Sequence, residues 1–433
     1  MRMEKPGAWK WPRSIAAIAL FAVPLALLPQ QQIPLPQNLP DPLIFQDGRR
    51  VANAGEWPKR RAELLHIFTE QMYGRMPDRP QKMRFKVFDR DANALGGLAT
   101  REQITIWLNG HGSGPSMDLL VYIPNRVRRP GVILGLNFWG NETVNDDPGV
   151  RVSRRWMESG KNPFLDLSCV KDHHATEACR GIDAHRWPVE KILRAGYALA
   201  TAYRGDIDPD LPDGYSQSVR ASYPELQKGD DNFSAIGAWA WGLSRALDYL
   251  VQDRRVDGGR VAVFGWSRLG KAATWAAATD PRFAALISNE SGAGGVKLFH
   301  HLQGETILHL NTVFPHWYCR NFKQYNNREA TLAFDQNMVL ALVAPRPVYV
   351  ASAMDDKLAD PEGEFLAAKA VTAVYEFLGA SGLPAEAWPA ANHAILGRVS
   401  YHVRSGVHDV TDFDWEQYLK FCDRYLGSAK KIR

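Results

Sequence analysis

The chain has 433 residues, 45% of them hydrophobic and 11% aromatic, so it can bury a large core and is neither disordered nor fibrous. Its 52 basic and 47 acidic residues are spread along the sequence and leave a formal net charge of +5. Such a diffuse charge does not indicate a nucleic-acid partner. It is typical of a solvated surface, although a mild basic bias would also suit an anionic polysaccharide.

The first residues have the composition of an export signal. Lys5, Lys10 and Arg13 precede the apolar run Ser14 to Leu28. This run of about 15 residues is shorter than the roughly 20 that span a bilayer. We therefore predict a signal peptide over residues 1–29, a periplasmic or extracellular protein and no stable membrane association. A clear small-x-small cleavage site is missing, so a retained anchor remains an alternative.

The rest of the chain fits one elaborated domain. Residues 30–45 are rich in Pro and Gln and are expected to form an extended leader. No low-complexity linker divides residues 46–433, which we predict to be a single domain. Within it, Trp57 to Met72 has the apolar spacing of a helix and is expected to cover one end.

From about residue 100, short apolar runs alternate with longer helical patterns, which indicates an α/β fold with a mostly parallel sheet between two helical layers. The runs are continuous rather than alternating, as expected for strands buried on both faces. They are Leu119 to Ile123, Val132 to Leu136, Ala198 to Ala202, Val261 to Phe264, Ala284 to Ser288 and Val348 to Ala351.

Three further segments lie between or around these strands. Phe233 to Val251 has the spacing of a helix that faces the core. Gly292 to Phe334 is long and has little periodicity, and such insertions are commonly functional. The four cysteines lack metal-ligand spacing; a Cys169–Cys179 disulfide and free buried thiols are both compatible with an exported chain.

The heptapeptide GWSRLGK, residues 265–271, joins a predicted strand to a helical run and centres on Ser267. In an α/β-hydrolase this sharp turn lifts a serine hydroxyl above the sheet edge, and flanking glycines give the crowded backbone room. Here Gly270 comes three residues after the serine instead of the usual two. Ser267 is thus a candidate nucleophile, and capping of the following helix is the alternative.

Arg268 follows this candidate nucleophile. Its backbone N–H lies where the fold builds one side of an oxyanion hole. Its guanidinium would stabilise a charged tetrahedral intermediate more than a neutral ester, which is the requirement for rate enhancement. A surface salt bridge is the alternative role.

A serine hydroxyl needs a base, which in this fold follows the last strand. Among His393, His402 and His408, we favour His408 because it directly precedes the helical segment Trp415 to Tyr425, and His393 is the competitor.

Two carboxylates are candidates to orient this base. Glu290 follows the run that ends at Ser288, and Asp356 follows the run that ends at Ala351. Either would fix the imidazole tautomer and stabilise the imidazolium. The residues alone slightly favour Asp356, which occupies the loop that most α/β-hydrolases use.

Over roughly residues 100–425 the sequence resembles the glucuronoyl esterases, carbohydrate esterase family 15. The resemblance rests on the turn GWSRLGK, similar to the family's G-x-S-R-x-G-K, on SNESG at residues 288–292, and on the histidine near the C-terminus. This combination is far more specific than a serine motif alone. It implies an α/β-hydrolase fold.

The resemblance also implies roles for individual residues. Ser267 would be the nucleophile, Arg268 part of the oxyanion hole, and Lys271 a contact to the glucuronate hydroxyls. Glu305 resembles the family's sugar-contacting glutamate, and Gln303 is a less secure second contact. For Glu305, a loop carboxylate without a ligand is the alternative.

For the acid, the resemblance reverses the ranking. Many members use a glutamate about two dozen residues after the serine, and Glu290 stands 23 residues after Ser267 (290 minus 267). Bacterial-type members can use an acid in the later loop, so Asp356 remains a candidate.

The sequence departs from the family pattern at three positions. Fungal members have cysteines beside the serine and the histidine, where this chain has Trp266 and Asp409, so it resembles the bacterial type. Leu358 stands where the family often has a tryptophan platform for the sugar.

The activity that the resemblance implies is hydrolysis of the ester between 4-O-methyl-glucuronic acid of glucuronoxylan and lignin or other alcohols. No cofactor or metal is expected, and we expect a monomer. An acetyl or feruloyl xylan esterase and a non-catalytic carbohydrate-binding protein are the alternatives.

Overall fold

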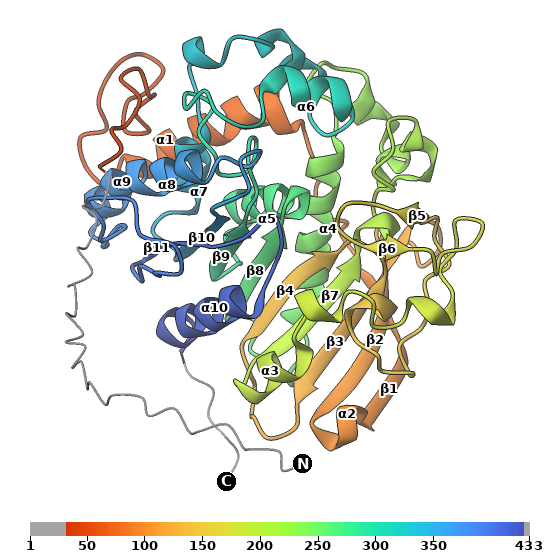
Figure 1. The fold of residues 1–433 in the computed structure, drawn as a ribbon. Coiled ribbons are helices and arrows are strands. Elements are labelled where there is room, and N and C mark those ends of the chain that lie inside the picture. Colours follow the sequence, from red (N-terminus) through yellow and green to blue (C-terminus); the bar gives the residue numbers. More distant parts are fainter. Residues whose placement is uncertain (1–31, 428–433) are drawn as a thin grey trace, which may run out of the picture.

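The computed structural model describes residues 32–427, so the predicted signal peptide lies outside the described residues. A nine-stranded sheet of order β1-β2-β3-β7-β4-β8-β9-β10-β11 runs through the described part of the chain (Figure 1). Its strands are β1 (Arg84–Asn93), β2 (Ala99–Trp107), β3 (Ser116–Pro124), β4 (Val132–Asn137), β7 (Ala198–Tyr203), β8 (Val261–Trp266), β9 (Ala285–Asn289), β10 (Val348–Ala353) and β11 (Val399–Arg404). All six predicted strands are present.

The sheet has a parallel part and an antiparallel edge. Strands β7, β4, β8, β9, β10 and β11 pair in parallel, whereas β1, β2 and β3 are antiparallel to their neighbours. Every residue of β4, β7, β8 and β10 is buried, as their continuous apolar runs predict.

Helices cover both faces of the sheet, which confirms the three-layer α/β-hydrolase architecture (Figure 1). On one face lie α3 (Val189–Arg194) and α10 (Asp412–Tyr425). On the other lie α1 (Trp57–Phe68), α4 (Ala235–Leu250), α5 (Arg268–Thr279), α7 (Gln336–Val343), α8 (Pro361–Ala370) and α9 (Thr372–Phe377). The predicted helices at Trp57 to Met72 and Phe233 to Val251 correspond to α1 with the π-helical turn Thr69–Tyr73, and to α4.

The remaining segments are short or irregular. The turn α2 (Ala94–Gly97) joins β1 to β2, and the two-residue strands β5 (Gly160–Lys161) and β6 (Asp166–Leu167) form a small hairpin. The insertion after β9 contains α6 (Ile307–Val313) and two 3-10 turns. Cys169 and Cys179 form a disulfide, whereas Cys319 and Cys422 are free and buried.

Within residues 30–45, which we predicted to be an extended leader, Leu43 and Phe45 are buried in the core. No helix within residues 32–427 is long and apolar enough to cross a membrane.

The parallel strands place the candidate residues at one edge of the sheet. Ser267 follows β8, Glu290 follows β9, Asp356 follows β10 and His408 follows β11. Because the carboxyl ends of parallel strands meet at the same edge, side chains from four distant segments converge there.

Candidate active site

Ser267 occupies a strained turn between β8 and α5. Its φ of 57° and ψ of −132° are unusual for a residue with a side chain, and its N–H donates to Asn289 O at 2.9 Å. A Cβ added to Gly265 would lie 2.1 Å from Leu269 O, and one added to Gly270 would lie 2.9 Å from Ser291 Cβ. Both glycines are therefore required by close approaches. The Ser267 side chain forms no capping bond with α5, contrary to the helix-cap alternative.

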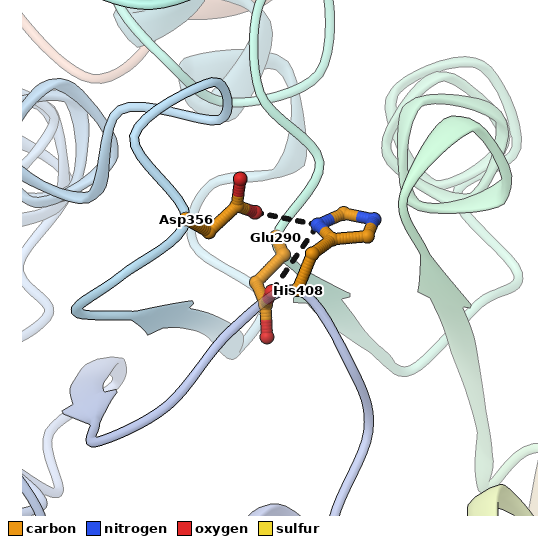
Figure 2. Close-up of side chains that lie close together, drawn as sticks. All are labelled: Glu290, Asp356 and His408. Atoms are coloured by element: carbon orange, nitrogen blue, oxygen red, sulfur yellow. Dashed lines mark hydrogen bonds and ion pairs between the residues drawn. The ribbon is translucent and has the colours of Figure 1, made fainter. Parts of the chain in front are cut away.

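His408 is held by two carboxylates from different strands. Its Nδ1 lies 2.5 Å from Asp356 Oδ2 and 3.2 Å from Glu290 Oε2. Figure 2 shows that both carboxylates approach the same ring nitrogen, while the other nitrogen points away from them. That arrangement leaves Nε2 as the nitrogen that can accept a proton.

The ring of His408 also contacts the turn of the candidate nucleophile. Its centroid lies 5.1 Å from that of Trp266, which directly precedes Ser267, and 5.4 Å from that of Phe164 on the β5–β6 hairpin. Within residues 32–427 no hydrogen bond joins Ser267 to His408, and such bonds are often long before substrate binds.

The two carboxylates have different environments. Glu290 is fully buried, and Arg404 Nη2 donates to its Oε1 at 2.6 Å. Burial raises the pKa of Glu290 to about 7. Burial would also raise the pKa of Asp356, but the hydrogen bond to His408 outweighs it, and that pKa lies below its ordinary value.

The histidine responds to both acids. Burial would lower the pKa of His408, but its bonds to Asp356 and Glu290 outweigh this effect and raise that pKa to about 9. The imidazolium is therefore strongly stabilised, as a general base requires when it takes up a proton.

The same three side chains have the composition of a metal site, with potential ligand atoms within 4.8 Å of one another. However, Arg404 already places a permanent positive charge on Glu290, and His408 Nδ1 is hydrogen-bonded to a carboxylate. The geometry suits a carboxylate-oriented histidine better than three ligands around one ion.

Arg268 lies beside Ser267 in a cavity of about 260 Å³ that Trp266, Phe164 and Arg204 also line. Its Nη1 donates to the carboxylate of Asp210 at 2.6 Å. The guanidinium carbon lies 4.9 Å from the ring centroid of Trp317. Arg268 is thus a cation held at the wall of the cavity, rather than a freely exposed surface group.

Lys271 and Glu305 form a second polar pair on the same side. Lys271 Nζ donates to Glu305 Oε2 at 2.9 Å and lies 5.6 Å from the Trp317 ring centroid, so Trp317 contacts both Arg268 and Lys271. Gln303 is exposed in the same loop as Glu305.

The loop after β10 reaches this pair, because the Glu305 N–H donates to Leu358 O at 2.8 Å. Three residues that sequence reasoning passed over are Arg404, Asp210 and Trp317. Arg404, four residues before the predicted base His408, could have been suspected, whereas the contacts of Asp210 and Trp317 depend on the packing of distant segments.

A strained serine turn after a central parallel strand and an acid-paired histidine after the last strand form the arrangement of an α/β-hydrolase. A family model described as glucuronyl esterase, fungi, matches residues 209–379. Carbohydrate esterase MZ0003, from an unknown prokaryotic organism, is 44% identical over 402 residues, which cover 91% of each chain. A fungal 4-O-methyl-glucuronoyl methylesterase from Wolfiporia cocos is 26% identical and covers 84% of this chain and 81% of its own.

Solved structures agree with these relatives. A promiscuous CE15 esterase from a marine bacterial metagenome has a TM-score of 0.84 at 43% identity, covering 90% of this chain and 98% of that one. The glucuronoyl esterase from Solibacter usitatus has a TM-score of 0.83, also at 43% identity and with the same coverage. The chain therefore belongs to carbohydrate esterase family 15, the glucuronoyl esterases, and is a carboxylic ester hydrolase. The predicted family and its bacterial type are confirmed.

Proposed function

We propose that the enzyme hydrolyses the ester between 4-O-methyl-glucuronic acid of glucuronoxylan and lignin or other alcohols. The observation that carries this proposal is a pair of cations on α5, Arg268 at the cavity and Lys271 one helical turn later, which both lie against the ring of Trp317. With Glu305 it provides donors and an acceptor suited to an acyl group that bears several hydroxyls.

The same geometry supports a serine mechanism. His408 Nε2 takes the proton of the Ser267 hydroxyl, whose oxygen attacks the uronate carbonyl. The N–H and guanidinium of Arg268 stabilise the oxyanion of the tetrahedral intermediate. The imidazolium then protonates the leaving alcohol, and water, activated by His408, cleaves the acyl-enzyme.

Asp356 is the main orienting acid in this proposal, and Glu290 is the secondary one. Asp356 makes the shorter contact with His408, 2.5 Å against 3.2 Å, and its lowered pKa keeps it ionised near neutral pH. This order reverses the ranking that the family resemblance implied. Glu290 is retained because it contacts the same nitrogen.

The test compares benzyl glucuronate with 4-nitrophenyl acetate. We expect a higher kcat/KM for the glucuronate ester, and equal or better acetate turnover would contradict the uronate assignment. This comparison matters because the metagenomic relative is described as promiscuous. A feruloyl ester is the third substrate, and a higher kcat/KM for it than for benzyl glucuronate would favour a feruloyl xylan esterase.

Ser267→Ala should abolish turnover but still bind glucuronate, measured by calorimetry, whereas Ser381→Ala, at an exposed serine, should retain full activity. Binding without turnover in the wild-type enzyme would instead support the non-catalytic alternative. If Ser267→Ala instead turned over substrate at the wild-type rate, Ser267 would not be the nucleophile.

We also propose export to the periplasm or the extracellular space, cleavage near residue 29 and a monomeric enzyme. Lys5, Lys10, Arg13 and the apolar run after them support the first two proposals. Cell fractionation with N-terminal sequencing tests them, and light scattering tests the third.

A further inference from the structure

Asp210 connects three segments of the chain behind the cavity wall. It lies in the loop after β7, and its Oδ2 accepts hydrogen bonds from Arg268 Nη1 at 2.6 Å and forms an ion pair with Arg204 Nη1 at 3.0 Å. Its Oδ1 accepts from Trp317 Nε1 at 2.7 Å and lies 3.0 Å from His316 Nε2. One carboxylate thus joins the β7 loop, the start of α5 and the insertion after β9.

This carboxylate is buried and charged. The side chain of Asp210 is 2% exposed, and its φ of 63° is unusual for a residue other than glycine. Burial would raise its pKa, but Arg268 and Arg204 hold that pKa well below its ordinary value. Asp210 therefore keeps its charge and its unusual backbone conformation because the groups around its carboxylate stabilise both.

The hydrogen bond to Asp210 restricts the orientation of Arg268. The guanidinium also lies 4.9 Å from the Trp317 ring centroid and 5.3 Å from that of Phe314. A long, flexible side chain is therefore fixed by a bond at one nitrogen and by aromatic rings around it. A preorganised donor of this kind stabilises an oxyanion without paying a reorganisation cost during the reaction.

We propose that Asp210 is a positioning residue for ester hydrolysis: it fixes the guanidinium of Arg268 at the cavity wall, where the oxyanion forms beside Ser267. This inference rests on the oxyanion role of Arg268 in the proposed function. Trp317, bonded to the same carboxylate, contacts both Arg268 and Lys271, so Asp210 also fixes the orientation of the two cations relative to each other.

The test is a double-mutant cycle of Asp210→Asn, Arg268→Gln and the double variant, with kcat, KM and Tm measured for each. We expect Asp210→Asn to lower kcat at least about tenfold with a smaller change in KM. In the Arg268→Gln background, the same substitution should lower kcat little further. Asp248→Asn is the matched control, because Asp248 is also a buried carboxylate that pairs with several arginines, but none of those arginines lines the cavity. It should lower Tm and retain kcat.

Asp210→Asn removes the carboxylate that Arg204 and Arg268 share, so part of any loss in Tm would reflect two cations left without their counter-charge. The variant Asp210→Asn/Arg204→Gln restores the charge balance, and we expect it to recover Tm but not kcat. The inference would be overturned by any of three results. The variant Asp210→Asn/Arg204→Gln recovers both Tm and kcat, or folded Asp210→Asn keeps a kcat within about twofold of wild type. In the third, the losses in kcat from Asp210→Asn and Arg268→Gln simply multiply in the double variant.

The substrates keep this test separate from the proposed function. The cycle is measured with both benzyl glucuronate and 4-nitrophenyl acetate, since any ester forms the same kind of oxyanion. Absence of uronate turnover would reject the proposed substrate, yet the acetate cycle would still support or reject the positioning role of Asp210.

Discussion

On one side of Ser267, Glu290 and Asp356 contact His408, and a single guanidinium, that of Arg404, pairs with both Glu290 and Asp414. On the other side, Arg268 and Arg204 share a single carboxylate, Asp210. With every carboxylate ionised and the histidines neutral, the base side carries an excess of negative charge and the arginine side an excess of positive charge. Each excess is opposite in sign to the charge that develops beside it, imidazolium on one side and oxyanion on the other.

The two sides differ in whether their charge can change near neutral pH. The pKa of Glu290 is about 7 and that of His408 about 9, so the base side takes up and releases protons in that range. The pKa of Asp210 lies well below its ordinary value, and guanidiniums stay protonated, so Asp210, Arg204 and Arg268 keep their charges in that range. The pH dependence of the catalytic step should therefore originate with Glu290 and His408.

The largest effect is expected for Asp356→Asn, which removes the shorter carboxylate contact of His408. We expect kcat to fall about 10³-fold, or about 4 kcal/mol of barrier, and Glu290→Gln to lower it only about tenfold. Steady-state kinetics on benzyl glucuronate measure both. A larger loss of kcat in Glu290→Gln than in Asp356→Asn would make Glu290 the main acid, as the family resemblance implied. If kcat fell less than tenfold in both variants, neither residue would be the acid that orients His408.

The same variants test the origin of the pH dependence. Only neutral His408 can act as base, so kcat/KM should rise with pH through the apparent pKa of the coupled cluster, near 9 in the wild-type enzyme. Loss of either acid removes a group that raises this pKa, so the midpoint should move to lower pH. A midpoint that stays unchanged in both variants would assign the profile to another group.

The arginine side should lower the rate without moving that midpoint. Arg268→Gln is expected to reduce kcat about 10²-fold, or about 2.7 kcal/mol, at every pH, because it removes a donor whose charge does not titrate. Full pH profiles of wild type and variant measure this. If the midpoint of the pH profile moved by more than about one pH unit in the variant, the two sides would be electrostatically coupled and could not be treated as separate.

Lys271 should affect binding more than chemistry. Lys271→Met together with Glu305→Gln removes the buried pair without leaving one charge unpaired. We expect about a tenfold higher KM for benzyl glucuronate and a nearly unchanged kcat/KM for 4-nitrophenyl acetate, which has no sugar hydroxyls. An equal loss on both esters would place this pair in general folding or in the oxyanion site instead.

The sequence predicts the parts of the fold whose physical signal is local. Continuous apolar runs identify β4, β7, β8 and β10, and two glycines beside Ser267 identify the strained turn. β11 was missed because His402 and Arg404 interrupt its apolar pattern. Both are nevertheless buried, paired with Asp414 at 2.8 Å and 2.9 Å.

Other features depend on contacts between distant segments. The edge strand β1 was missed because it is largely exposed and rich in charge, so it lacks the pattern of a buried strand. Asp210 shows no motif in the sequence, and its importance arises from Arg268, His316 and Trp317, which are 58, 106 and 107 residues away. The competition between Glu290 and Asp356 likewise depends on two distances to His408 that follow only from the packing of β9, β10 and β11.

The smallest effect is expected at Leu358, which is 56% exposed and lies beside the Lys271–Glu305 pair through the bond from Glu305 N–H to its carbonyl. Leu358→Trp should lower the KM for benzyl glucuronate about threefold, roughly 0.6 kcal/mol, because an aromatic face adds contact area for the sugar ring. Leu302→Trp, at a more exposed leucine in the insertion, is the control and should leave KM unchanged. If Leu358→Trp changes kcat rather than KM, this loop acts on the reacting carbonyl instead. The distinction between residues that bind the sugar, near Lys271 and Glu305, and residues that carry the chemistry, near Ser267, would then not hold.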